Sequence, residues 1–275
     1  MKANPETGAG KKTRSRKIAR LIEDNYRSVL VIIGFFLFWE LAVRILHIPE
    51  FRLSSPSNAL AHLFFKQPDA NYHWGVNIPA TLIEFVQAFV ITSALGIAIS
   101  ILIVWSRHAK DMLMPLFIFI NSLPIIAIAP IILLRMGYGI TTNMFIAFLV
   151  SFFPVLINTI TGLDAIEEDL LDLIRYLHAS KLQLFVKIRI PNSLPYIFSG
   201  LKICATMSIV GAIVGEFISS NKGLGYVITN AQYTLDTPPV FASLIIISLA
   251  GGALFVIITL FERLLMPWAY VKERV

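Results

Sequence analysis

The stretch 240-VFASLIIISLAGGALFVIITL-260 decides the fold, because it contains no Asp, Glu, Lys or Arg. A helix needs roughly 20 mostly apolar residues, at about 1.5 Å rise each, to cross the hydrocarbon core of a bilayer. The other stretches that meet this condition are residues 28–46, 78–104, 112–134, 143–161 and 194–219. Short segments of alternating polarity, the signature of a membrane β-barrel, are absent. The sequence therefore predicts an all-α polytopic membrane protein with about six transmembrane helices.

The composition agrees with this architecture. Of the 275 residues, 56% are hydrophobic and 15% are charged, whereas an ordinary soluble domain is about 25% charged. This composition excludes a typical soluble enzyme and a disordered protein. Cys204 is the only cysteine in the sequence, so a disulfide scaffold within the chain is excluded as well.

The basic residues predict the orientation of the helices. Most Lys and Arg residues lie in segment 1–27, in the loops on the same side and in the tail 263–275. The other side receives Arg52, Lys66, Arg135 and Lys222. Because Lys and Arg are in excess on the cytoplasmic side, both termini are predicted to be cytoplasmic. The net charge of +6 is thus read as a topology signal. Nucleic-acid binding is not expected, because no nucleic-acid-recognition motif accompanies the basic residues.

The long inside loop 162–193 is patterned as a helix–turn–helix elbow. Asp164 with Glu167, and Ser180 with Gln183, have the form of helix N-caps with a supporting side chain three residues later. Pro191 is expected to end the second short helix. Between the caps, apolar residues recur at helical spacing: Ile166, Leu170, Leu173, Ile174 and Leu177. The elbow, residues 164–190, either lies on its own bundle or on lipid, or fills the groove of a soluble partner.

This elbow resembles the cytoplasmic Glu-Ala-Ala loop of permease subunits of bacterial ATP-binding-cassette importers. Asp172-Leu173-Ile174 stands at Glu-Ala-Ala, and Ile188-Arg189-Ile190-Pro191 stands at the closing Ile-x-Leu-Pro. His178 stands where the family has a glycine, a residue that permits a positive φ. His is among the non-glycine residues enriched in that conformation.

The chain from 53 to 268 resembles the nitrate/sulfonate/taurine-type branch of these permeases. The resemblance rests on the order and spacing of several short motifs: Ser55-Pro56-Ser57, Phe153-Pro154-Val155-Leu156-Ile157-Asn158-Thr159, Gly215-Glu216-Phe217, Gly223-Leu224-Gly225-Tyr226, Glu262-Arg263 and Pro267-Trp268. It implies the type I importer permease fold. Residues 28–77 would supply a first helix and an outer loop, residues 78–262 the transmembrane core, and residues 1–27 and 263–275 the cytoplasmic ends.

The resemblance also implies the partners. The sequence has no Gly-x4-Gly-Lys-Ser/Thr loop, so ATP and Mg are expected on a separate cytoplasmic ATPase dimer, and no cofactor, metal site or catalytic residue is expected here. The further expected partners are a second permease copy, an extracytoplasmic substrate-binding protein and the lipid of the bacterial inner membrane. The residues expected to couple to the ATPase are Asp164, Glu168, Asp172, Arg175, His178, Ala179, Ser180, Gln183, Phe185 and Pro191.

Charged residues inside spans are functional candidates. Glu40 and Arg44, four residues apart, are expected to pair. Glu84 is expected to reach the outer interface, and Lys202 to snorkel to the inner one. Glu216 is predicted near an outer gate, with a backbone-bonded glutamate at the interface as the alternative.

Polar and small residues suggest a pathway and a subunit seam. Pro115, Pro124 and Pro130 are expected to break the third span, and Pro154 the fourth. The kinked helices either line a pathway or simply pack, through Asn121, Ser122, Ser151 and Asn158. A face of small residues permits close helix approach. It is predicted to meet a second copy through Ser208, Gly211, Ala212 and Gly215.

Two other functions are weighed against an ATP-driven importer. An ATP-independent secondary transporter usually shows an internal repeat and paired broken helices. An intramembrane enzyme needs a nucleophile and a base at membrane depth, and the histidines fall in predicted loops or interfaces. Within the importer reading, nitrate, sulfonate, taurine, bicarbonate and pyrimidine-type precursors all stay open as cargo.

Overall fold

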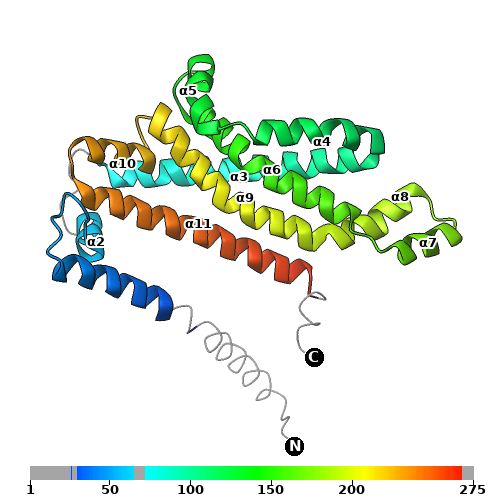
Figure 1. The fold of residues 1–275 in the computed structure, drawn as a ribbon, viewed down its shortest axis with the longest axis horizontal. Helices are drawn as coiled ribbons and strands as arrows, with labels where there is room; N and C mark the ends of the chain where they lie inside the picture. The colour runs from blue at the N-terminus through cyan, green and yellow to red at the C-terminus, as the bar shows by residue number, and fades with distance from the viewer. Residues whose placement is uncertain (1–25, 27–29, 65–71, 268–275) are drawn as a thin grey trace, which may run out of the picture.

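The computed structural model describes residue 26 and residues 30–64 and 72–267. The predicted segment 1–27 (apart from residue 26), Lys66 and the tail residues 268–275 lie outside this part. The described part is helical and contains no strand (Figure 1). After a helix over residues 30–45, the elements are α2 (Pro56–Phe64), α3 (Trp74–Trp105), α4 (Arg107–Asn121), α5 (Ile125–Met136), α6 (Ile140–Asp164), α7 (Glu168–Tyr176), α8 (Lys181–Leu184), the π-helical turn η1 (Phe185–Arg189), α9 (Ile190–Ser219), α10 (Leu224–Tyr233) and α11 (Thr237–Leu265).

Long apolar helices confirm the all-α polytopic membrane fold. Within the described residues, four helices are long and apolar enough to cross a bilayer: Trp74–Trp105, Ile140–Asp164, Lys181–Ser219 and Thr237–Leu265. They coincide with the second, fourth, fifth and sixth predicted spans. The first predicted span corresponds to the helix over residues 30–45, whose preceding residues 27–29 are not described.

The third predicted span, residues 112–134, is not one helix. It consists of α4 and α5, which are bent by 93° relative to each other. Pro124 has no N–H and disfavours a helical conformation at the residue before it, so the helix ends there. The breaks expected at Pro115, Pro130 and Pro154 do not occur, because α4, α5 and α6 continue through these residues.

The centre of the bundle is the contact between α6 and α9. A Cβ atom on Gly211 would lie 2.5 Å from the Cα of Ala147, and one on Gly215 would lie 2.7 Å from the Cα of Asn143. The two backbones therefore approach as closely as glycine allows. This corrects the seam prediction: Ser208, Gly211, Ala212 and Gly215 are buried against the same chain and are not available to a second copy.

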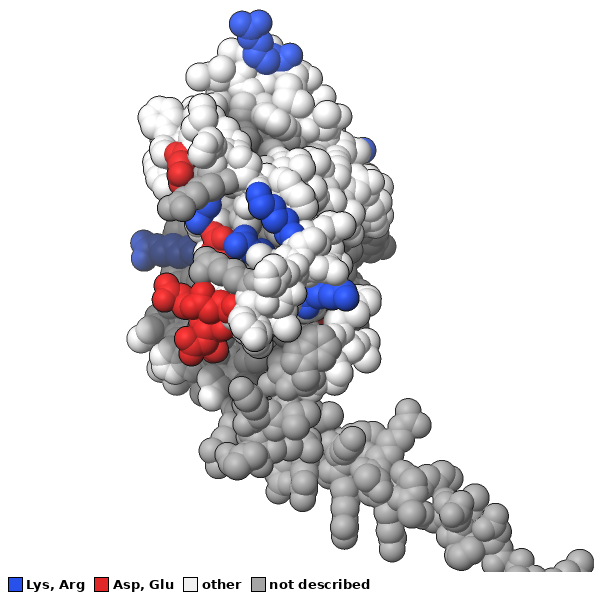
Figure 2. Space-filling view, turned by 90° about the vertical axis from the view of Figure 1, so that its right-hand side faces the viewer, with Lys and Arg blue, Asp and Glu red and all other residues white. Residues whose placement is uncertain are grey.

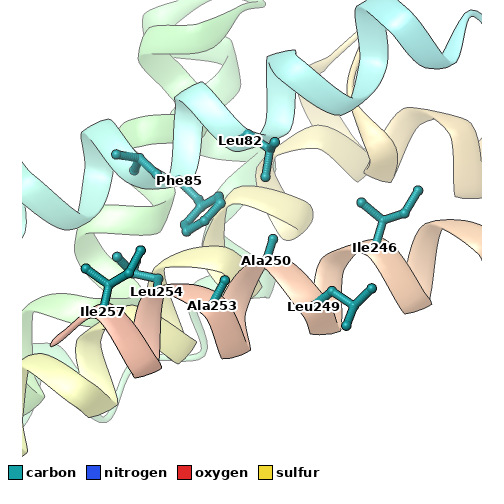
Figure 3. A pocket seen from close by; sticks show the side chains of 9 residues that line it. Leu82, Phe85, Ile246, Leu249, Ala250, Ala253, Leu254 and Ile257 are labelled. Carbon is teal, nitrogen blue, oxygen red and sulfur yellow. The ribbon is translucent and has the colours of Figure 1, made fainter. Parts of the chain in front are cut away.

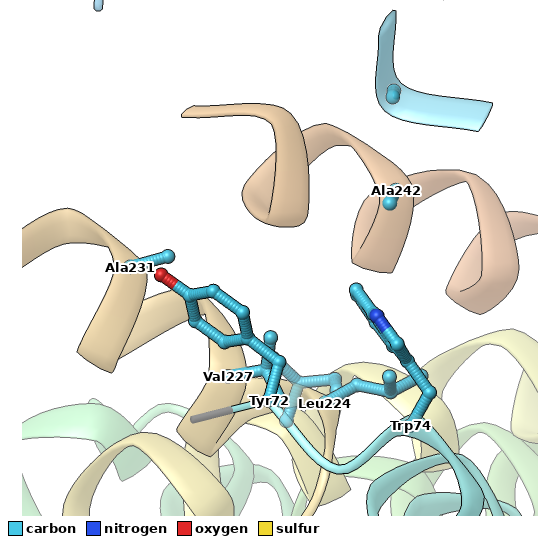
Figure 4. Close-up of a cluster of buried hydrophobic side chains, with 8 residues drawn as sticks. Tyr72, Trp74, Leu224, Val227, Ala231 and Ala242 are labelled. Atoms are coloured by element: carbon cyan, nitrogen blue, oxygen red, sulfur yellow. The ribbon is translucent and has the colours of Figure 1, made fainter. Parts of the chain in front are cut away.

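The end of the bundle that carries α2 and α10 is closed by a buried apolar cluster (Figure 4). The rings of Tyr72 and Trp74 lie between α10 and α11, against Leu224, Val227 and Ala242. The hydroxyl of Tyr72 donates a hydrogen bond of 3.0 Å to Asp236, directly before α11. We call this the outer end; the elbow lies at the opposite end of the molecule (Figure 1).

An apolar groove of about 470 Å³ runs along the flank between α3 and α11. Figure 3 shows Leu82 and Phe85 on one wall and Ile246, Leu249 and Ile257 on the other. Every side chain that lines the groove is apolar. The flank is therefore compatible with the hydrocarbon core of a bilayer.

The α6–α9 contact gives a first prediction. We expect Gly211→Ala to destabilise the protein by about 1–3 kcal/mol, because the added methyl group overpacks the contact with Ala147. Gly252→Ala is the matched control, since this helical glycine has no heavy atom within 4 Å of an added Cβ. The control is expected to be neutral or stabilising by up to about 1 kcal/mol. Thermal unfolding in detergent measures both, and equal midpoints would contradict the prediction.

Candidate functional site

The elbow is anchored to the bundle through Asp164. Its carboxylate lies 2.6 Å from the ammonium of Lys110, at the start of α4, and 3.7 Å from a guanidinium nitrogen of Arg189 in η1. The prediction that Asp164 caps the first elbow helix is wrong, because Asp164 is the last residue of α6 and α7 begins at Glu168. Through these ion pairs the aspartate instead joins α6, on which it lies, to α4 and η1.

The turn between α7 and α8 explains the position of His178. This residue has φ 52°, a left-handed conformation. The N–H of Ala179 donates to the carbonyl of Ile174, which is the six-to-one bond of a Schellman motif with His178 at the position that usually holds glycine. The ring Nδ1 lies 2.9 Å from the carbonyl oxygen of Tyr176. The positive φ expected here is thereby confirmed.

The second elbow helix begins as predicted and ends differently. Ser180 accepts a hydrogen bond from the N–H of Gln183, and the Gln183 side chain accepts one from the N–H of Ser180, which is a complete capping box. Pro191 does not end this helix, because the chain is helical from Lys181 to Ser219. The π-helical turn η1 ends at Arg189, two residues before Pro191, and such a turn re-routes the backbone bonds that a proline disturbs.

The elbow presents apolar side chains to its surroundings. Leu173, Tyr176, Leu177 and Leu182 are each more than half exposed. Phe185 is buried instead, with its ring 5.3 Å from that of Trp105. Figure 2 shows acidic and basic side chains side by side on this end of the molecule. Glu168 and Asp172 are exposed on α7. The side chain of Arg175 is not among those that the structure describes.

A buried polar cluster lies at the outer end. Glu216 on α9 is 1% exposed. Its Oε1 accepts a hydrogen bond of 2.6 Å from the hydroxyl of Thr81 on α3, and its Oε2 accepts one of 2.5 Å from the N–H of Gly225 in α10. Thr81 also accepts from the N–H of Leu224 at 2.7 Å, and Asn77 accepts from that of Gly223 at 2.8 Å. The start of α10 is thus held by side chains of α3 and α9.

The glycines before and within α10 make room for this carboxylate. Gly223 has φ 107°, and a Cβ there would overlap the carboxyl group of Glu216. A Cβ on Gly225 would lie 2.7 Å from the Cβ of Glu216. The motifs Gly215-Glu216-Phe217 and Gly223-Leu224-Gly225-Tyr226 are therefore two parts of one contact.

The sequence had suggested that Glu84 reaches the outer interface, and this prediction is wrong. It is fully buried, and its Oε2 accepts a hydrogen bond of 2.9 Å from the side-chain amide of Asn143 on α6. Asn143 in turn accepts a hydrogen bond from Ser219. Sequence reasoning missed Thr81 and Asn143 as members of this cluster. The signal was the placement of Asn77, Thr81 and Glu84 on one helical face of an apolar span.

The predicted pathway residues are not brought together. Ser151 is buried and bonds the carbonyl of Ala147, whereas Asn158 is half-buried and bonds that of Pro154. Glu216 is buried and makes the hydrogen bonds described above, so its carboxyl group does not face an open pathway. Asn121 and Ser122 are exposed at the break between α4 and α5.

The other charged residues of the spans are paired. Arg44 lies 2.6 Å from Glu40, as predicted. Lys202, expected to snorkel, lies 2.5 Å from Glu262 of α11 and so joins α9 to that helix. In the described residues, no group of three or more His, Cys, Asp or Glu side chains is placed to hold a metal ion.

Comparison with known protein families shows to which family the chain belongs. Residues 92–267 match the family described as the binding-protein-dependent transport system inner membrane component. The chain belongs to this family. The resemblance of the chain to importer permeases is thereby confirmed, and the protein is a multi-pass inner-membrane permease.

Named relatives cover most of the permease. The formylaminopyrimidine transport permease protein ThiX of Halalkalibacterium halodurans is 32% identical over 84% of this chain and 90% of its own length. The riboflavin transport system permease protein RibX of Chloroflexus aurantiacus is 30% identical, over 84% of this chain and 85% of its own. The nitrate import permease protein NrtB of Synechocystis is 29% identical over 74% of both.

The outer polar cluster gives a second prediction. Thr81→Val removes the hydrogen bonds of the hydroxyl with Glu216 and Leu224, together with its longer contact with the carbonyl of Asn77, and each buried group left without a partner costs about 1–3 kcal/mol. We therefore expect a clearly lower unfolding midpoint in detergent, largely restored by Thr81→Ser. Thr259→Val serves as the control, because among the described residues this exposed hydroxyl bonds only the carbonyl of Phe255 in its own helix. A Thr81→Val protein as stable as the control would show that the cluster does not hold α10.

Proposed function

We propose that this permease is the membrane-spanning subunit of an ATP-driven, binding-protein-dependent importer whose elbow receives movement from a separate cytoplasmic ATPase dimer. The observation that carries the proposal is the elbow itself: a short helix–turn–helix that is firmly anchored and exposes apolar side chains. Leu173, Tyr176 and Leu177 are more than half exposed in the part of the chain that the structure describes. An apolar helical face of this kind fits a hydrophobic groove in a partner protein.

The anchoring supports a mechanical role for the elbow. The ion pairs of Asp164 with Lys110 and Arg189 fix the base of the elbow to α4 and η1. The side-chain amide of Asn192 donates a hydrogen bond of 2.5 Å to the carbonyl of Ala165. An element fixed at several points moves as a rigid body together with the helices to which it is tied.

The helix that follows the elbow is long enough to pass this movement on. The segment Lys181–Ser219 has 39 residues, about 58 Å at the helical rise. It begins in the elbow and ends at the outer polar cluster. A displacement of α8 would therefore act on Glu216 and, through it, on the start of α10.

The alternative placements of the elbow have less support. An elbow that lay on its own bundle would bury Leu173 and Leu177, which are instead exposed. An elbow that lay on the membrane surface would bring Glu168, Asp169 and Asp172 to anionic headgroups, which attract basic segments instead. A secondary transporter usually has paired broken helices, and one bent pair is found in the described residues.

We further propose that the break between α4 and α5 faces the transport pathway, at the interface with a second copy of the permease. Irregular backbone at membrane depth is tolerated where it is buried in protein or lines a water-filled cavity. The break leaves Asn121, Ser122 and Leu123 exposed in the single chain. A second copy facing this break supplies the protein environment that the exposed backbone requires.

The cargo is proposed to be a small solute delivered by an extracytoplasmic binding protein. The relatives carry names that refer to a formylaminopyrimidine, riboflavin and nitrate. Permeases of one family are thus associated with chemically different solutes. This supports a permissive pathway here, with much of the selectivity in the binding protein.

The docking proposal predicts the effect of a charge on the elbow face. Leu173→Asp is expected to reduce co-purification of the partner ATPase at least about tenfold, which corresponds to about 1.4 kcal/mol of binding energy. Uptake driven by ATP should fall with it. Tyr233→Asp is the matched control, since this aromatic residue is 85% exposed at the outer end. Full co-purification and uptake with Leu173→Asp would overturn the docking proposal.

The pathway proposal predicts where water reaches the protein. Ser122→Cys should react with a charged, membrane-impermeant thiol reagent in the assembled transporter. Leu249→Cys, on the exposed apolar flank, should be protected by lipid, and Ser151→Cys should be protected by burial. The native Cys204 is fully buried and gives a low background. Labelling of Ser122→Cys no faster than that of Leu249→Cys would exclude a water-lined break.

A further inference from the structure

Two buried glutamates face each other at the outer end, and the proposed function uses neither as an acid. Glu84 is 0% exposed and Glu216 is 1% exposed. In the part of the chain that is described, neither carboxyl group forms an ion pair. A buried carboxylate without a cation is costly, and two adjacent ones also repel each other.

The two side chains belong to one ring of contacts between three helices. Thr81, which donates to Glu216, stands one helical turn before Glu84 on the same face of α3. Asn143 donates to Glu84 and accepts from Ser219, which stands one turn after Glu216 on α9. These shared neighbours place the two carboxyl groups in one buried cluster, where each acts on the other.

The other members of the cluster supply no hydrogen for a bond between these two carboxyl groups. Both oxygens of Glu216 accept from other groups, namely Thr81 and the N–H of Gly225. The Oε2 of Glu84 accepts from Asn143, whereas its Oε1 has no donor among the described protein groups. A carboxylate has acceptor oxygens only. A hydrogen bond between the two groups therefore requires that one of the carboxyls carries the hydrogen.

Among the residues that the structure describes, no cation contacts the pair in place of this hydrogen. From α6 the pair meets the neutral amide of Asn143, and from α10 it meets backbone N–H groups. The cation that acts on Glu84 through space is Lys222, in the turn before α10, and its side chain is exposed at the surface. Its charge is therefore largely screened by water.

We propose that Glu84 and Glu216 form a proton-binding site that holds one proton between α3 and α9. The proton is covalently bound to one carboxyl oxygen and hydrogen-bonded to an oxygen of the other residue, so the pair carries one negative charge instead of two. Its departure to water would break this O–H bond and leave two carboxylates in contact. The proton is thus part of what allows α3, α6, α9 and α10 to pack together at the outer end.

Infrared spectroscopy of the full chain in lipid nanodiscs at neutral pH tests this site. A protonated carboxyl group has a carbonyl stretching band that a carboxylate lacks, and we expect this band in the unmodified protein. Glu84→Gln keeps an oxygen for Asn143 and supplies an N–H to Glu216, so its fold should be retained. Because the partner of the protonated group changes, the band should shift or disappear.

The control is Glu262→Gln, which removes a carboxylate that is paired with Lys202. The band should be the same in this variant as in the unmodified protein. Absence of the band from the unmodified protein overturns the proposal without any variant. A band that is unchanged in Glu84→Gln overturns it as well. Neither result depends on the transport role, which is tested by ATPase binding and uptake.

Discussion

The first backbone N–H groups of α10 have no acceptors within their own helix, and the rest of the outer end is arranged around them. At the start of a helix such groups need partners, and within a membrane protein an unsatisfied one costs several kcal/mol. Asn77, Thr81 and Glu216 supply the acceptors. Because two of them stand on α3 and one on α9, these bonds form only when both helices lie against α10. The packing of three elements is therefore fixed by one local requirement.

This requirement extends through α9 to the other end of the molecule. The close approach of Gly211 and Gly215 to α6 keeps Glu216 at a fixed depth beside Asn143. The same continuous helical segment begins in the elbow, where Asp164 joins α6 to α4 and η1. The coupling that we propose between the two ends therefore needs no chain of small rearrangements. It follows from one long helix that is tied to the bundle by its glycines and at both ends by polar contacts.

Features that depend on neighbouring residues in the chain were accessible from the sequence. Hydropathy predicted the long apolar helices, the spacing of Ser180 and Gln183 predicted a capping box, and the glycine position predicted the positive φ of His178.

Features that depend on which helix faces which were not accessible from the sequence. A face of small residues permits close approach to any helix, so the sequence could not tell that Gly211 and Gly215 meet α6 of the same chain. Glu84 was misplaced for the same reason, since its partner Asn143 lies on a different helix. The 93° bend at Pro124 also lay beyond reach, because a proline ends a helix without fixing the direction of the next one.

The contact between Glu216 and the glycines explains why two weak motifs, Gly215-Glu216-Phe217 and Gly223-Leu224-Gly225-Tyr226, are informative when they occur together. Gly223 and Gly225 leave no space for a Cβ beside the Glu216 side chain, and Gly215 leaves none beside Asn143. Each glycine is therefore required by the residue it contacts as well as by its own backbone. A larger residue at position 225 would push Glu216 out of its place and remove the acceptor for the start of α10. Short motifs that are joined in this way must be retained together, so their combined presence is far more specific than the presence of any one of them.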